Sequence, residues 1–284
     1  MAVEMSETTR TLQRHLENAR FEVLPLRGVV EQVGNLPEGT TVTVTSSPKK
    51  GVEATLDVAA RVRGLGHHVV PHLAARLLTG PAHLAAVLDR IEGLGMTEVF
   101  AVAGDSAEPA GPYPDALSLL RAMEELGRRP SRVGITGYPE RHAFIPDATT
   151  ISAMSEKAAH ADYIVSQICY DPHALASWVK DVRARGVVLP IHIGVPGVVD
   201  VHRLLRISLK IGLGESMRFL RKQHGVVTKL LTRYTPEELF DELSPHLADP
   251  AYGIAGWHFF TFNEVDRTDR WRQDLLARIG EVPA

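Results

Sequence analysis

Short runs of β-branched and apolar residues recur along this chain, and each is followed by a polar or Gly/Pro break and a longer stretch with helical periodicity. This alternation is typical of parallel strands joined by crossover helices, and it limits the folds available more than any other feature of the sequence. The chain contains eight candidate strands: Phe21–Leu26, Thr41–Thr45, His68–His72, Glu98–Ala103, Arg132–Thr136, Tyr163–Ile168, Val188–Ile193 and Ala255–Phe262.

Seven crossovers and a terminal helix over Glu264–Ile279 favour a (β/α)₈ TIM barrel over the alternative, an open doubly wound sheet. The 284 residues also suit one barrel, since this fold commonly takes about 250 residues. We therefore expect a single α/β domain over residues 1–284. The expected crossover helices include Glu53–Arg63, Pro81–Leu94, Pro114–Leu126, Ile151–Ala159, Pro172–Arg185 and Val199–Ile211.

Two segments lie outside the regular alternation. Residues 1–19 form a predicted helical extension, in which Ser6–Asn18 places Leu12 and Leu16 on one face. We expect this helix to cover the bottom of the barrel or to contact a partner. The interval Gly212–Asp249 is rich in apolar residues and predicts two or three extra helices before the last strand, an insertion that can close over a site.

Composition indicates which kinds of ligand and which cellular location to expect. The net charge is −3, from 31 basic and 34 acidic residues, and no long basic run indicates binding to nucleic acid or an anionic membrane. Cys169 is the only cysteine, and neither a signal-peptide core nor a long apolar run is present. We expect a cytoplasmic protein with small-molecule ligands. A homo-oligomer is among the expected states, since many barrels associate symmetrically.

Glu22 is the candidate for acid–base chemistry. Active sites of such barrels lie at the C-terminal ends of the strands. Glu22 lies between Phe21 and Val23 in an apolar run, where an inward-facing carboxyl loses hydration and resists ionisation. This environment suits a general acid. An outward-facing Glu22 that pairs with an arginine is an equally compatible reading of the spacing.

Further polar residues close the other strands. Asp105 follows Gly104, a glycine that permits close approach of a ligand, although capping of a helix or loop is the competing role for this aspartate. Gln167 is expected at the barrel mouth, where its amide needs hydrogen-bond partners. Each remaining candidate has packing or internal hydrogen bonding as its alternative role: Thr45, Ser46, His72, Tyr138, His142, His192, Thr261 and Asn263.

Phosphate-binding and metal motifs are weak in this sequence. Gly194-Val195-Pro196-Gly197 lacks the third glycine of a dinucleotide fingerprint. His67, His68 and His72 contain only one pair at helical spacing, and they lie in a predicted strand. We expect no metal site.

Taken together, the strand ends resemble those of methylenetetrahydrofolate reductases over most of the barrel. Seven motifs in the family's order carry this resemblance. They are Phe21-Glu22 with Pro25, Thr43 to Thr45, Pro71-His72-Leu73, Gly104-Asp105, Tyr138-Pro139-Glu140 with His142, Gln167 with Asp171, and His258 to Asn263.

The resemblance implies reduction of 5,10-methylenetetrahydrofolate to 5-methyltetrahydrofolate, a step that serves methionine biosynthesis. It makes Glu22 the general acid that protonates N10, and Asp105 the residue that binds the pterin and stabilises the iminium cation. Gln167 would also hold the folate, and Phe219 is a candidate for the aromatic residue that contacts it. Five positions match the family's flavin or pterin pocket: Thr45, His72, Gly104, Tyr138 and His142.

The flavin pattern departs from that of the family. Ala103 replaces the arginine before Gly-Asp, Phe144 replaces a glutamate, and Ser155-Glu156-Lys157 replaces a basic cluster. A dinucleotide's pyrophosphate is normally held by cations or backbone amides. FAD therefore remains a candidate cofactor, but the sequence argues against tight binding. We expect hydride to pass directly from NADH or NADPH to the folate, with Lys157 or Arg141 as the remaining candidate cations for a flavin.

Two other functions remain compatible with these residues. A deazaflavin-dependent or otherwise different barrel reductase can keep the fold and the acid while changing the hydride donor. A noncatalytic folate-binding or partner subunit can keep Asp105 and Gln167 for binding. The presence of Glu22 argues against the noncatalytic alternative, because binding alone does not require an acid.

Overall fold

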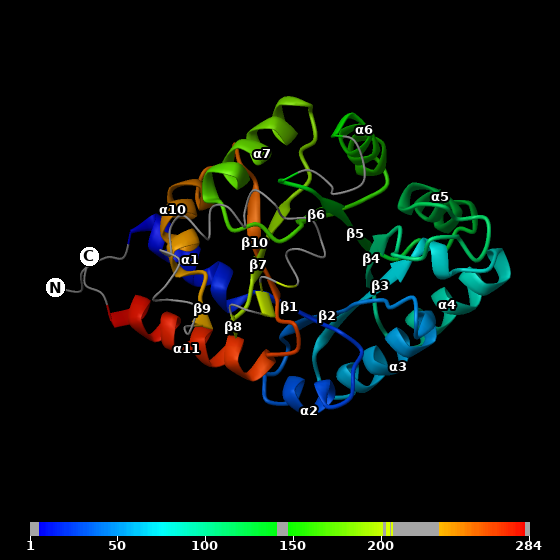
Figure 1. The fold of residues 1–284 in the computed structure, drawn as a ribbon, viewed down its shortest axis with the longest axis horizontal. Coiled ribbons are helices and arrows are strands. Elements are labelled where there is room, and N and C mark those ends of the chain that lie inside the picture. The colour runs from blue at the N-terminus through cyan, green and yellow to red at the C-terminus, as the bar shows by residue number, and fades with distance from the viewer. Residues whose placement is uncertain (1–5, 141–146, 201–202, 205, 207–232, 282–284) are drawn as a thin grey trace.

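A computed structural model describes residues 6–140, 147–200, 203–204, 206 and 233–281 of the chain. Eight parallel strands close into a barrel in the order β1-β10-β7-β6-β5-β4-β3-β2, which confirms the predicted (β/α)₈ fold (Figure 1). The barrel strands are β1 (Arg20–Val23), β2 (Thr41–Val44), β3 (His68–Ala74), β4 (Glu98–Val102), β5 (Arg132–Gly137), β6 (Tyr163–Ser166), β7 (Ile191–Pro196) and β10 (Ile254–Phe260).

Helices surround the barrel, and α3, α4, α5, α6 and α7 match predicted crossover helices, whereas the short α2 between β1 and β2 was not predicted (Figure 1). Two helix starts follow from local chemistry: Pro81 and Pro172 occupy first-turn positions, where a missing N–H costs nothing. The described helices are α1 (Glu7–Glu17), α2 (Val29–Val33), α3 (Gly51–Arg63), the 3₁₀ turn η1 (Ala75–Leu77), α4 (Pro81–Gly93), α5 (Ala116–Glu125), α6 (Asp147–Ala158), α7 (Pro172–Ala184), α10 (Glu237–Leu247) and α11 (Val265–Glu281).

The prediction of a helix starting at Val199 is wrong. Val199–Asp200 form the short strand β8, which pairs antiparallel with β9 (Arg233–Tyr234). Val199 is buried against Tyr170 and Tyr234, and the Asp200 carboxylate accepts a hydrogen bond from the Arg203 N–H at 3.1 Å. This bond satisfies a free donor at the start of a helical turn, so the helical residues begin after Asp200 rather than at Val199.

The predicted N-terminal helix is confirmed as α1. The Ser6 hydroxyl accepts a hydrogen bond from the Thr9 N–H and caps the helix. Leu16 is fully buried, and the Arg272 guanidinium on α11 donates to its carbonyl at 3.0 Å. The first and last helices are therefore packed together beside the barrel (Figure 1). Of the extra helices predicted before the last strand, α10 is described, and residues 212–232 lie outside the described part of the chain.

The strands alternate between two environments. In β1, Phe21 and Val23 face the surrounding helices and belong to the main hydrophobic cluster, whereas Arg20 and Glu22 face the barrel interior. A second, smaller cluster of Val70, Phe100, Tyr163 and Val165 fills the middle of the interior. This alternation brings the Glu22 side chain inside the barrel.

A paired ionic network fills the lower end of the interior. Glu98 accepts from Arg20 at 2.6 Å and from the His68 ring at 3.1 Å, and Arg20 also donates to the Tyr163 hydroxyl at 3.0 Å. The Arg132 guanidinium lies 4.9 Å from the centre of the Tyr163 ring. Each of these five residues is the first residue of its strand. The network therefore spans the N-terminal end of the barrel, opposite to Glu22.

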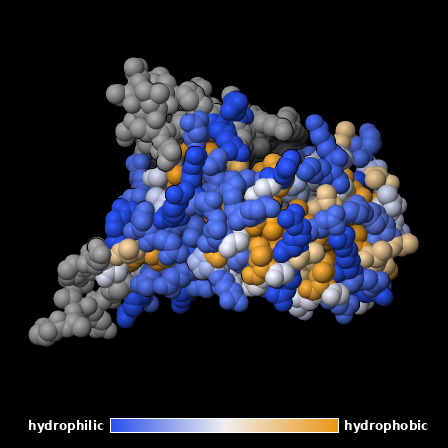
Figure 2. Space-filling view, turned by 90° about the horizontal axis from the view of Figure 1, so that it is seen from below, coloured by the Kyte–Doolittle hydropathy of each residue, from blue (hydrophilic) through white to orange (hydrophobic). Residues whose placement is uncertain are grey.

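The outer surface is mostly hydrophilic on the face drawn in Figure 2, with hydrophobic residues gathered toward the α3–α4 end. In the described part of the chain, no helix has the length and apolar character needed to cross a membrane.

Candidate active site

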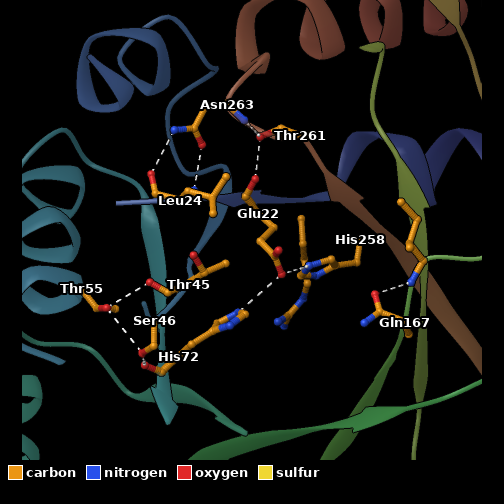
Figure 3. Close-up of polar contacts among 12 residues, drawn as sticks. Glu22, Leu24, Thr45, Ser46, Thr55, His72, Gln167, His258, Thr261 and Asn263 are labelled. Carbon is orange, nitrogen blue, oxygen red and sulfur yellow. Dashed lines mark hydrogen bonds and ion pairs between the residues drawn. The ribbon is translucent and has the colours of Figure 1, made fainter. Parts of the chain in front are cut away.

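Glu22 points into the upper barrel interior and contacts two histidines (Figure 3). Its Oε2 atom lies 3.1 Å from Nε2 of His258 on β10 and 3.7 Å from Nε2 of His72 on β3. The first distance is a hydrogen bond, and the second is too long for one. Glu22 therefore does not pair with an arginine on the helix side, which was the alternative reading of the sequence.

The two histidines are almost fully buried. Burial lowers the pKa of His72 to about 4, although the nearby Glu22 carboxyl acts in the opposite direction. His72 is therefore neutral near pH 7 and places no positive charge beside Glu22. Its ring also packs on Phe100, with ring centres 4.8 Å apart. His72 thus places an uncharged ring, packed against Phe100, next to the Glu22 carboxyl.

His258 was not singled out as a site residue by the sequence, although it begins the His258–Asn263 motif. It is 1% exposed and forms the one hydrogen bond to the Glu22 carboxyl group among the described residues. The signal that can find it is its strand position. His258 lies two residues after the glycine Gly256 on the inward-facing side of β10, and Arg20 is its register partner on β1.

Several buried polar atoms around Glu22 have no hydrogen-bond partner among the described residues. They are Thr45 Oγ1, His72 Nε2 and His258 Nδ1, together with Oγ1 of Thr43, the register partner of Glu22 on β2. Both ring nitrogens of His192, which packs edge-on against Tyr163 lower in the barrel, are also without a partner among the described residues. Buried polar groups in native proteins are nearly always paired, with protein, water or ligand. This end of the interior therefore offers hydrogen-bonding groups that the fold itself does not use.

Asp105 and Tyr138 lie near one another at the top of β4 and β5. Asp105 is exposed, and its charge adds to the effect of burial in raising the pKa of Tyr138. The N-terminal cap of α5 is Asp115, not Asp105. Gly104 has a φ of +91°, and a Cβ atom there would lie 2.9 Å from the Ala74 Cβ. Backbone conformation and packing against β3 therefore require this glycine, whether or not a ligand approaches it.

Gln167 is half-buried at the end of β6. Its side-chain oxygen accepts a hydrogen bond from the neighbouring Ile168 N–H at 2.8 Å (Figure 3). The backbone N–H of Gln167 donates to Gly137 on β5 at 2.7 Å. The side-chain oxygen is therefore occupied by the chain's own backbone, and the amide NH₂ group is the part suited to a ligand. His142 and Phe219, two further predicted site residues, lie outside the described residues.

A cavity of about 270 Å³ lies beside this strand end rather than over Glu22. Tyr138 and Pro139 line it on one side, and Trp178 and Asp181 of α7, with Arg185 just after that helix, on the other. It is therefore a groove between β5 and the outer helices, separate from the side chains that face Glu22.

The described residues at the family's phosphate-binding positions do not fit a flavin dinucleotide. Ala103 carries no charge, and Glu156 is exposed and accepts a hydrogen bond from Ser152. Lys157 is 8% exposed, and burial lowers its pKa while the Asp115 carboxylate acts against this shift. Lys157 thus lies in the protein interior near the start of α5. Arg141 and Phe144 lie outside the described residues.

Thr261 and Asn263 join the end of β10 to the end of β1 (Figure 3). The Thr261 hydroxyl donates to the Glu22 carbonyl at 2.6 Å. The Asn263 side chain accepts from the Leu24 N–H at 2.8 Å and donates to the Leu24 carbonyl at 3.1 Å. Phe262 and Asn263 both have positive φ, at 50° and 63°. Such a conformation costs a non-glycine residue about 1–3 kcal/mol and persists only where the surroundings enforce it.

Comparison with known proteins identifies the same family that the strand-end motifs resemble. The family model described as methylenetetrahydrofolate reductase matches residues 26–214, so Glu22 and the His258–Asn263 motif lie outside the matched range. A solved structure of a Clostridium thermocellum protein that binds two copies of 5-methyl-5,6,7,8-tetrahydrofolic acid has a TM-score of 0.64 at 12% identity. The match covers 94% of this chain and 98% of that one, and at this identity it shows the fold alone.

Two curated relatives carry the family name. Methylenetetrahydrofolate reductase 2 of Saccharomyces cerevisiae is 24% identical over 186 residues, which cover 60% of this chain and 30% of that protein. Methylenetetrahydrofolate reductase (NADH) 1 of Zea mays is 29% identical over 230 residues, which cover 69% of this chain and 35% of that protein. The chain thus spans about a third of the length of these relatives. Since the family model covers most of the chain, the protein belongs to the methylenetetrahydrofolate reductase family.

Proposed function

We propose that this protein reduces 5,10-methylenetetrahydrofolate to 5-methyltetrahydrofolate with NADH or NADPH as the hydride donor. The observation that carries the proposal is the inward-facing Glu22, hydrogen-bonded to His258 at 3.1 Å and bordered by the neutral His72. A carboxyl held at the C-terminal end of the barrel strands is in the position where enzymes of this fold carry out their chemistry. Family membership supports the identity of the substrate.

In this proposal the Glu22 carboxyl donates its proton to N10 of the folate. The bond between N10 and the bridging methylene carbon then breaks, and its electron pair stays on N10. The methylene carbon remains on N5 as an iminium cation. His258 fixes the Glu22 carboxyl through the 3.1 Å hydrogen bond, and a proton from solvent restores the acid after each turnover.

The iminium carbon then accepts a hydride from the nicotinamide ring, which yields the 5-methyl product and oxidised nicotinamide. The exposed carboxylate of Asp105 at the barrel mouth is suited to stabilise the cation. Because Ala103, Glu156 and the buried Lys157 do not fit a flavin pyrophosphate, we propose direct transfer, with no step through a flavin.

The unpaired polar atoms near Glu22 supply the binding groups in this proposal. Thr45 Oγ1 and His72 Nε2 are buried without partners and suit the pterin or the nicotinamide amide. Gly104, Tyr138 and His142 would contribute to cofactor binding from the ends of β4 and β5, and the Gln167 amide NH₂ and Phe219 would hold the folate. We further propose that the protein acts in the cytoplasm.

The direct test is oxidation of NADH by the purified protein with methylenetetrahydrofolate, under anaerobic conditions, with and without added FAD. We expect wild type to form 5-methyltetrahydrofolate without added FAD, and Glu22→Gln to lose about 10²–10⁴-fold in rate, as removal of a general acid does. Unchanged activity of Glu22→Gln would remove Glu22 as the acid. Absence of product from wild type, with or without FAD, would contradict the proposed reaction.

The hydride route has its own test. With NADH deuterated at C4, direct transfer delivers deuterium to the methyl group of the product in equal amount to the NADH consumed. A reduced flavin exchanges its transferable hydrogen with solvent before it reacts, so label lost to water would contradict direct transfer. Stoichiometric yellow flavin in the purified protein would contradict it as well.

A further inference from the structure

The barrel closes between its first strand, β1, and its last strand, β10, and Glu22 lies where this closure ends. The parallel ladder pairs Arg20 with His258, Phe21 with Phe259 and Glu22 with Phe260, and no later pair follows. Beyond this point the segments that follow β1 and β10 lead to different helices, α2 and α11. The backbone therefore leaves this strand pairing directly after Glu22, the residue whose side chain needs an accurate position.

Two side chains continue the pairing where the ladder stops. The Glu22 carbonyl accepts from both the Thr261 N–H, at 3.3 Å, and the Thr261 hydroxyl, at 2.6 Å. One step further, the Asn263 amide acts like the peptide group of a missing strand residue and bonds both the N–H and the carbonyl of Leu24. Glu22 and Leu24, the two residues that flank Val23, are thus both held by the segment directly after β10.

The backbone conformation at this turn serves the same contact. Phe262 and Asn263 are the two non-glycine residues with positive φ in the described chain. The Arg203 guanidinium holds the strained turn by donating to the Phe262 carbonyl at 2.6 Å, and the Phe262 ring packs on the cluster that contains Ile168 and Tyr170. A turn with negative φ at these residues would move the Asn263 amide away from Leu24. The strained conformation is therefore what allows the two hydrogen bonds to Leu24.

We propose that Asn263, supported by Thr261, is a positioning residue that sets the location of the Glu22 carboxyl relative to the substrate. This inference rests on the proposed function of Glu22 as the acid. Asn263 contacts the Glu22 strand through Leu24 and is assigned no contact with substrate. A misplacement of about 1 Å in a catalytic group can lower a rate by about 100-fold, so the loss of this clamp should appear in kcat.

Asn263→Gly and Asn263→Asp separate the amide from the backbone. Glycine adopts a φ of 63° freely, so Asn263→Gly removes the two hydrogen bonds while it relieves the local strain. Asn263→Asp keeps the acceptor for the Leu24 N–H but places an anionic oxygen against the Leu24 carbonyl. The matched control is Asn35→Ala, which removes an exposed amide whose hydrogen bond, at 3.0 Å, goes to Asp266 on α11 rather than to β1.

We expect Asn263→Gly to lower kcat by about tenfold or more with KM for NADH changed by less than about threefold, a smaller loss for Asn263→Asp, and wild-type constants for Asn35→Ala. Amide hydrogen exchange at Leu24 should become faster in Asn263→Gly. Full kcat in Asn263→Gly, in an active wild-type background, would overturn the inference alone. Slow exchange at Leu24 in that variant would overturn the assigned bonds. A wild type that forms no product would instead overturn the proposed function.

Discussion

The two ends of the barrel interior are built from the same strands but treat their polar groups in opposite ways. At the lower end, Glu98 is bonded to Arg20 and His68, and Arg20 to Tyr163, so buried charges meet partners. At the upper end, Thr45, His72 and His258 each leave a buried polar atom without a partner in the described chain. On β1 the two ends are two residues apart, at Arg20 and Glu22.

This difference separates a role in stability from a role in chemistry. A paired buried network costs little while it is intact and a great deal when one member is lost. A buried polar atom without a partner lowers the stability of the fold through its lost hydration, and this cost is recovered when a ligand or water bonds it. The lower end therefore holds the barrel together, and the upper end is available for substrate. The predictions below test this division.

The largest effect on stability is expected at the lower end. Glu98→Gln should lower the free energy of unfolding by about 3–5 kcal/mol, because it leaves the buried Arg20 guanidinium without its counter-charge. Denaturant titration followed by circular dichroism measures this loss. The double variant Arg20→Met/Glu98→Leu should recover much of it, since an apolar pair needs no partners. A Glu98→Gln protein as stable as wild type would show that the network does not stabilise the barrel.

The two ends of the barrel should affect stability in different pH ranges, and the upper end should act at the higher pH. His72 takes up a proton in the fold only below about pH 4, but near pH 6.5 when unfolded. The unfolded chain therefore binds more protons between these values, and stability falls as pH decreases from about 6.5 to 4, by about 3 kcal/mol for this group. His72→Gln should reduce that loss. A stability curve in this range that is unaffected by the substitution would contradict the buried, neutral His72.

The lower end should respond at more acidic pH. Burial raises the pKa of Glu98, but the hydrogen bonds from His68 and Arg20 and the charge of Arg20 outweigh this and lower it to about 2. Stability from Glu98 is thus present above about pH 4.5 and is lost as pH falls toward 2. Acid unfolding of wild type and Glu98→Gln measures this. Parallel curves for the two proteins below pH 4.5 would contradict the assignment.

The smallest effect on stability is expected at Thr45. Thr45→Val removes a buried hydroxyl that has no partner among the described residues, so the free energy of unfolding should change by less than about 1 kcal/mol. The same variant should raise KM for folate or NADH if that hydroxyl bonds a ligand. Thermal denaturation and steady-state kinetics check both parts. A large loss of stability would mean that Thr45 already has a structural partner.

Sequence periodicity predicts the barrel well, because each strand must be apolar on its helix-facing side. All eight predicted strands are present, and the later start of β7 has a local cause: it begins after Pro190, which cannot donate a ladder hydrogen bond. The two-residue strands β8 and β9 are too short to produce a pattern. Their pairing depends on burial of Val199 and Tyr234, which is a tertiary effect.

The site is less visible in the sequence than the fold. The strand-end rule finds Glu22 and His72, but it cannot tell whether Glu22 faces inward, because strand alternation has two settings and only the assembled barrel selects one. The lower network had a sequence signal, because five strands begin with a charged or polar residue. Strand prediction treats such residues only as markers of where a strand starts. The Asn263 clamp depends on positive φ values, which the Phe262-Asn263 pair does not predict.

The central claim is that Glu22 at the open end of the barrel supplies a proton to the reaction. Its most direct test is the rate of methylenetetrahydrofolate reduction as a function of pH for wild type and Glu22→Gln. We predict that the wild-type rate declines as pH rises, as expected for a reaction that takes up a proton through an enzyme acid, and that this decline is absent from the residual activity of Glu22→Gln. A wild-type rate that is flat across roughly pH 5 to 9, or a decline that survives in Glu22→Gln, would contradict the claim.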